Sequence, residues 1–302
     1  MDLRPSSRPR DRRSGPVPSR TAWLLTADGE RVSAAYDVAG VGADPGLAIV
    51  VAHGFTGGWR RPDSRAIATE LAASGAVVSF DARGHGRSSG RTTLGDAEVL
   101  DLDAAVAWAR WLGAEKVVTV GFSMGGSVVL RHAALAARGD RSAPDAVVSV
   151  SAAGFWFYRG TAPMRLLHRA VESPVGRAIL RHGFDTHVTD QAWEEPYPLS
   201  PSESAAMVPP VPLLVVHGTE DTYFPLEHAA SIVRHAREGA ASRGVPDRTD
   251  EWVEEGFAHA ESGASPELVS RIGAWARAAV RHDAVTAEGT DAVQDARPGG
   301  GE

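Results

Sequence analysis

Short apolar runs alternate with stretches of helical periodicity through most of the chain. The run LAIVVAHG at 47–54 is almost entirely apolar, which is typical of a strand covered on both faces. The next segment, DSRAIATELAASG at 63–75, has helical spacing and ends in glycine. The same alternation predicts further strands at 31–39, 76–83, 116–122, 146–153, 211–218 and 247–256, and further helices at 96–113, 124–138, 226–236 and 266–280.

Repeated strand, helix, strand units predict an α/β fold with a mostly parallel, twisted sheet and helices on both faces. The alternation breaks at Gly154 and resumes with the strand at 211–218. The intervening segment is too long for an ordinary connection and is rich in aromatic residues. We therefore expect a helical cap inserted between strands 6 and 7.

The two ends of the chain lack apolar periodicity. Residues 1–21 are rich in Arg, Pro and Ser, and residues 283–302 are acidic and rich in glycine, so we expect both to be disordered tails. The folded part is then a core made of residues 22–153 and 211–282, with residues 154–210 as the cap.

Composition excludes several classes of function. The chain has no cysteine, which rules out disulfides, thiolate metal sites and a cysteine nucleophile. A net charge of −7 argues against a nucleic-acid partner, because there is no basic stripe to neutralise phosphates. No apolar run approaches the roughly 18–20 residues of a membrane span, so we expect a soluble cytoplasmic protein. Its oligomeric state stays open.

The pattern G-x-S-x-G, which marks a serine held on a sharp turn for nucleophilic attack, occurs twice, around Ser88 and around Ser123. Ser123 stands where the strand at 116–122 runs directly into a helix, as a nucleophile elbow requires. Ser88 lies in a loop rich in Arg and Gly, several residues past its strand. We therefore predict Ser123 as the nucleophile.

A serine nucleophile needs a base, and the base needs an orienting carboxylate. In parallel sheets such groups gather in the loops after the strands. The loop HGTEDTYFP offers Glu220 and Asp221, and the loop EGFAHAES offers His259 as the base. Two backbone amides must also face the developing negative charge. We expect these from Met124, directly after the nucleophile, and from Phe55 in the loop HGFTGG.

The motifs HGF, DARGHGRS, GFSMGG, HGTED and FAH occur in this order, and the chain from about residue 22 to residue 282 resembles the α/β-hydrolase superfamily. It looks most like the capped serine esterases, monoacylglycerol lipases and lysophospholipases, which are sometimes called serine aminopeptidases. The resemblance implies Asp221 as the orienting acid and hydrolysis through an acyl-enzyme on Ser123 without a cofactor. The cap matches no single subfamily.

The apolar residues of the cap segment are candidates for a substrate-binding wall, because ligand pockets are mostly apolar. The candidates are Phe155, Trp156, Leu166, Leu167 and Trp193. With no acidic cluster to clamp a substrate amine, they favour a small-molecule ester with an apolar acyl group.

The sequence is also compatible with other functions. The same triad supports a C–C bond hydrolase, a thioesterase, an aminopeptidase or a perhydrolase, and a hydrolase fold can also serve as a non-catalytic binding module. The motif HGFDTH contains His182, Asp185 and His187, which could bind a metal. The chain lacks H-E-x-x-H, however, and the polar end of a cap helix explains this motif equally well, so we predict no metal site.

Overall fold

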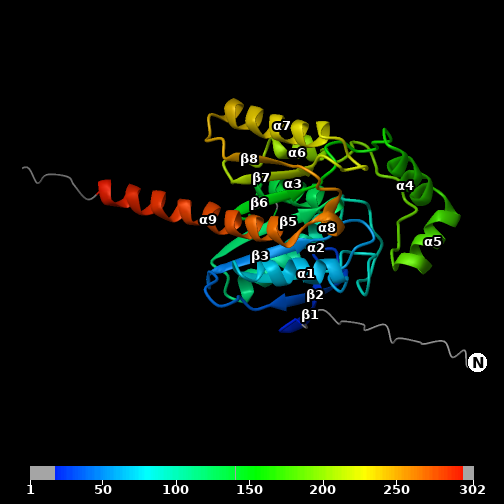
Figure 1. The fold of residues 1–302 in the computed structure, drawn as a ribbon, viewed down its shortest axis with the longest axis horizontal. Coiled ribbons are helices and arrows are strands. Elements are labelled where there is room, and N and C mark those ends of the chain that lie inside the picture. The colour runs from blue at the N-terminus through cyan, green and yellow to red at the C-terminus, as the bar shows by residue number, and fades with distance from the viewer. Residues whose placement is uncertain (1–17, 140, 295–302) are drawn as a thin grey trace, which may run out of the picture.

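The computed structural model describes residues 18–294 except residue 140. Within them, eight strands form one sheet in the order β1-β2-β4-β3-β5-β6-β7-β8, parallel from β4 to β8 and antiparallel at β1 and β2 (Figure 1). The strands are β1 (Arg20–Leu25), β2 (Arg31–Asp37), β3 (Leu47–Ala52), β4 (Ala76–Phe80), β5 (Lys116–Phe122), β6 (Ala146–Val150), β7 (Leu213–Gly218) and β8 (Thr249–Glu254).

Helices cover both faces of the sheet, and each face has its own apolar core. One core joins the sheet to α2 (Glu98–Trp111), α3 (Met124–Ala136) and α7 (Glu227–Arg243). The other joins it to α1 (Pro62–Leu71) and α9 (Pro266–Gln294). Side chains alternate along β3, so that Val50 enters the first core and Ile49 the second. The predicted α/β class is confirmed.

The segment between β6 and β7 divides into two parts. Helices α4 (Ala162–Glu172) and α5 (Pro174–Phe184) pack on each other and stand outside the sheet, on the side where the parallel strands end (Figure 1). The short helix α6 (Pro201–Ala205) packs instead against α3 and α7, and Ala205 is fully buried. This helix therefore packs with the core, where four of its five residues are buried.

The elements also differ from expectation near the ends. Strand β1 begins at Arg20, inside the expected tail 1–21, and pairs with β2 along its whole length. Helix α9 continues to Gln294, past the expected end of the fold at residue 282, because no proline interrupts the sequence before Pro298. Residues 1–17 and 295–302 lie outside the described part. None of the described helices has the length and hydrophobicity of a membrane span.

A buried ion pair joins α1 to the antiparallel edge of the sheet. The Arg65 guanidinium donates to both carboxylate oxygens of Asp37, at 2.7 and 2.9 Å, and the two side chains are only 6% and 13% exposed. Removing one partner leaves the other charge buried without its counter-ion. Breaking such a pair costs about 3–5 kcal/mol.

We therefore expect Asp37→Ala and Arg65→Ala each to lower the free energy of unfolding by about 3–5 kcal/mol, and the double variant to lose clearly less than the sum. Urea denaturation followed by circular dichroism measures all three. Additive losses would mean that the two charges do not depend on each other.

Candidate active site

Ser123 sits on a strained turn between β5 and α3. Its backbone has φ 51° and ψ −114°, which a non-glycine residue adopts only when its surroundings force it. The glycines on either side allow the turn to close: a Cβ on Gly121 would lie 2.1 Å from the carbonyl oxygen of Gly125, and one on Gly125 would lie 2.1 Å from that of Ala52. Neither position can hold a side chain without moving the backbone.

Three loops at the ends of parallel strands bring Ser123, His259 and Asp221 together. The Oγ of Ser123 lies 3.0 Å from Nε2 of His259, and Nδ1 of His259 lies 2.7 Å from a carboxylate oxygen of Asp221. The Asp221 side chain is fully buried and that of His259 is 17% exposed. A serine, an imidazole and a carboxylate in this chain of contacts can transfer the hydroxyl proton to the imidazole.

The loop after β7 holds Asp221 in place. Its second carboxylate oxygen accepts hydrogen bonds from the amides of Tyr223 and Phe224, at 2.8 and 3.0 Å. The Phe224 carbonyl accepts in turn from Nε2 of the buried His217, at 2.8 Å. The Tyr223 ring stacks on His259, with 4.4 Å between the ring centres. The neighbouring Glu220 is exposed and takes no part in these contacts.

The second serine of the repeated pattern has a different environment. The Ser88 hydroxyl donates to the carbonyl oxygen of Asp81 and accepts from the amide of Ser33, at 2.5 and 2.9 Å. These bonds tie its loop to β2 and to the end of β4. Among the residues that the structure describes, no imidazole is hydrogen-bonded to this hydroxyl, so no base is placed to activate it.

The loop after β3 presents the amide of Phe55. Nε2 of His53 accepts from the amide of Ala82 at 2.9 Å, so its Nδ1 carries the proton and donates to the carbonyl oxygen of Gly54 at 2.7 Å. Because a peptide unit is planar and trans, this bond directs the N–H of Phe55 the opposite way. Phe55 and Met124 both line the cavity that contains Ser123.

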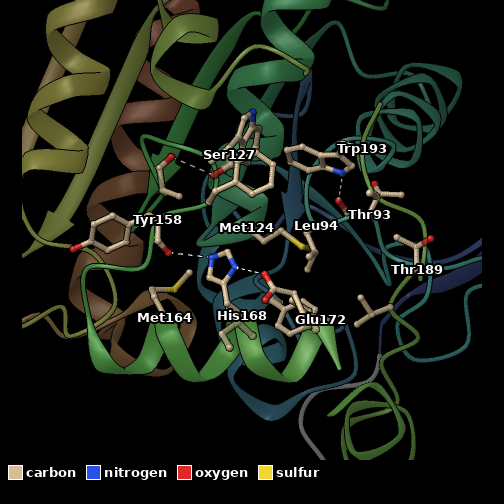
Figure 2. A pocket seen from close by; sticks show the side chains of 18 of the residues that line it. Thr93, Leu94, Met124, Ser127, Tyr158, Met164, His168, Glu172, Thr189 and Trp193 are labelled. Atoms are coloured by element: carbon tan, nitrogen blue, oxygen red, sulfur yellow. Dashed lines mark hydrogen bonds and ion pairs between the residues drawn. The ribbon is translucent and has the colours of Figure 1, made fainter. Parts of the chain in front are cut away.

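Two cavities meet at Ser123. One, of about 440 Å³, is lined in part by α4 and has mostly apolar and aromatic walls, which include Phe155, Trp156, Leu167 and Trp193. Figure 2 shows Trp193, Met124 and His168 around this cavity. The expected Leu166 is not part of it: its side chain is 66% exposed on the outer face of α4. On a helix the adjacent residue points about 100° away, so the inner position falls to Leu167.

The wall of this cavity also carries a polar group that the sequence analysis missed. His168 and Glu172, one turn apart on α4, lie 3.2 Å apart, and Nε2 of His168 donates to the carbonyl oxygen of Tyr158 at 3.1 Å (Figure 2). Glu172 also pairs with Arg159. The spacing of four residues on an amphipathic helix was the available signal. These contacts tie α4 to the aromatic run at 155–158.

The second cavity, of about 430 Å³, contains the imidazole. Ser123, His259, Tyr223 and Glu261 are among its walls, together with Arg61 from the start of α1. Glu261 was also missed, because it is one acidic residue among many in the sequence. His259 lines this cavity and is not part of the wall of the first.

The motif HGFDTH lies at the end of α5. Asp185 is the left-handed residue that ends this helix, and His182 and His187 are both exposed. In the part of the chain that the structure describes, no group of three or more His, Asp or Glu side chains is arranged to hold a metal ion.

Comparison with known proteins places the fold in a family. Residues 49–269 match the Alpha/beta hydrolase family, and the chain belongs to it. The esterase Pf2001 from Pyrococcus furiosus is similar in structure, with a TM-score of 0.64, 21% identity and coverage of 86% of this chain and 92% of that one. Est1E from Butyrivibrio proteoclasticus with bound ferulic acid has a TM-score of 0.56 and 19% identity, with coverage of 83% of this chain and 96% of that one. XC6422 from Xanthomonas campestris, described as a serine hydrolase without a lid, has a TM-score of 0.54 and 17% identity, with coverage of 88% of this chain and 95% of that one.

The contrast between the two serines predicts their response to substitution. Ser123→Ala should lower kcat by about 10⁴-fold or more without unfolding the protein, whereas Ser88→Ala should retain most of the activity. A fluorophosphonate probe should label the wild type and Ser88→Ala but not Ser123→Ala. Equal labelling of the wild type and Ser123→Ala would place the nucleophile elsewhere.

The two acidic neighbours after β7 make a second matched pair. Asp221→Asn should lower kcat by about 10⁴-fold, because the amide no longer holds the imidazole in the productive tautomer. Glu220→Gln changes an exposed side chain and should lower kcat far less. Steady-state kinetics of both variants with one ester decides the matter, and the reverse ranking would assign the orienting role to Glu220.

Proposed function

We propose that this protein is a serine hydrolase that cleaves carboxylic esters of apolar acyl groups through an acyl-enzyme on Ser123. The observation that carries the proposal is the unbroken chain of contacts from Ser123 to His259 to Asp221 at the meeting point of two cavities. That the structurally similar Pf2001 is described as an esterase agrees with this proposal.

The reaction follows from the positions of these groups. Nε2 of His259 removes the proton from Ser123 as Oγ attacks the ester carbonyl, and the amides of Phe55 and Met124 stabilise the resulting oxyanion. The imidazolium then gives its proton to the departing alcohol oxygen. Water, activated by the same imidazole, attacks the acyl-enzyme and releases the acid. Asp221 stabilises the imidazolium in both halves of the reaction.

The two cavities divide the substrate between them. The leaving oxygen must lie beside Nε2 of His259 to receive its proton, and His259 lines only the second cavity. The alcohol part therefore belongs in that cavity and the acyl part in the first. Apolar and aromatic walls in the first cavity favour an uncharged acyl chain.

The same cavity argues against aminoacyl amides as substrates. A free α-amino group needs an unpaired carboxylate close to the reacting carbonyl. In the first cavity, Glu172 is engaged by Arg159 and His168, and Asp190 lies 3.6 Å from Arg91. Glu172 is thus already paired, and Asp190 is exposed to solvent beside Arg91, which favours esters over aminopeptidase substrates.

The length of the acyl chain in the substrate tests whether the first cavity binds the acyl group. Each buried methylene contributes about 0.8 kcal/mol, so kcat/KM should rise roughly three- to fourfold per added CH₂ until the cavity is full. We would measure p-nitrophenyl esters from acetate to decanoate, with alanyl and prolyl anilides alongside. A flat ester series, or anilides cleaved faster than the butyrate ester, would contradict the proposal.

The two adjacent leucines of α4 provide the control. Leu167→Ala removes part of the cavity wall and should weaken the dependence on chain length, whereas Leu166→Ala changes the outer face and should leave it as in the wild type. An equal effect of both substitutions would indicate that the cap acts through its stability and not through contact with the acyl chain.

A further inference from the structure

The turn that carries His259 is strained at the next residue. Ala260 is buried and has φ 49°, and its amide donates to the Ser151 hydroxyl at 3.1 Å. A positive φ at a residue that is neither glycine nor asparagine costs energy, and such strain gathers at functional sites. Here it turns two side chains, those of His259 and Glu261, toward the surroundings of Ser123.

Glu261 reaches the loop that presents the amide of Phe55. One of its carboxylate oxygens accepts a hydrogen bond from the amide of Gly54 at 2.6 Å, across a sequence separation of 207 residues. The other oxygen lies close by: a Cβ placed on Gly54 would be 3.1 Å from it and 3.2 Å from Cβ of Ser123. The Glu261 carboxyl group, Gly54 and the Ser123 side chain are therefore neighbours.

We propose that Glu261 is a positioning residue that holds the oxyanion-stabilising loop in register with the catalytic imidazole. This inference rests on the proposed function, because it concerns the stabilisation of the same oxyanion. Glu261 fixes the amide nitrogen of Gly54, while His53 and the amide of Gly57 fix its carbonyl oxygen. With both ends of Gly54 held, the N–H of Phe55 keeps one direction as negative charge develops on the substrate.

We expect Glu261 to position the loop through its hydrogen bond with the Gly54 amide, and not through its charge. Burial raises the pKa of Glu261, and the bond from Gly54 together with the nearby His53 and His259 oppose that rise. A carboxyl oxygen accepts from the Gly54 amide in either protonation state, and so does the side-chain oxygen of glutamine. Glutamine at position 261 should therefore preserve the positioning of the loop, whereas a side chain without a hydrogen-bond acceptor should lose it.

A comparison of Glu261→Ala, Glu261→Gln and the control Glu267→Gln tests the inference. Glu267 is exposed at the start of α9, away from both cavities. With p-nitrophenyl butyrate, Glu261→Ala should lower kcat about 10- to 100-fold with KM changed less than about threefold, because a misdirected oxyanion donor weakens only the transition state. Glu261→Gln should stay within about threefold of the wild type, as should Glu267→Gln.

Inhibition by an alkyl trifluoromethyl ketone separates positioning from simple anchoring of the turn. Its adduct with the serine carries an oxyanion, so Ki for Glu261→Ala should rise by about the same factor as kcat falls. An unchanged Ki overturns the inference, as does an equal loss of kcat in the Gln and Ala variants or an Ala variant as active as the control. If Glu261→Ala does not fold, Glu261→Leu, which fills part of the space with a side chain that has no hydrogen-bond acceptor, gives the same comparison.

Ser123→Ala, measured in parallel, separates a failure of the proposed hydrolase function from a failure of the positioning role of Glu261. If it keeps full activity, the proposed function fails. If it is inactive while Glu261→Ala matches the control, only the positioning role of Glu261 fails.

Discussion

The active-site region depends on the close approach of backbone at the turn between β5 and α3. The carbonyl oxygens of Ala52 and Gly125 occupy the space where side chains at Gly125 and Gly121 would lie, so the turn can form only with glycine at both positions. The same close packing forces Ser123 into a left-handed φ and lifts its hydroxyl above the ends of the parallel strands. The imidazole of His259 lies beside the Ser123 hydroxyl oxygen, and Asp221 lies behind the imidazole.

Hydrogen bonds between loops then fix the groups around the serine. His53 and His217 each bind a backbone carbonyl, and the Asp221 carboxylate receives two backbone amides in addition to His259. Polar side chains in these loops thus orient the backbone, and the backbone orients the reacting groups. Such preorganisation matters because donors already aimed at the developing charge need not reorganise during the reaction.

The two faces of α4 have different environments. Its inner face supplies apolar side chains to the cavity beside Ser123, and His168 on that face ties the helix to the aromatic run at 155–158. Its outer face carries the exposed Leu166. The packing of α6 against α3 and α7 holds the end of the inserted segment on the sheet-covering helices.

Features that arise within short segments could be predicted from the amino-acid sequence. Apolar periodicity marked the parallel strands, and the direct passage from strand to helix separated Ser123 from Ser88. Three other features became visible in the three-dimensional structure: the side of α4 that faces the cavity, the packing of α6 with the core, and the hydrogen bond between Glu261 and Gly54 across 207 residues. Local periodicity reflects burial of one face of an element, whereas contacts between distant segments depend on how the whole chain packs, which no local pattern records.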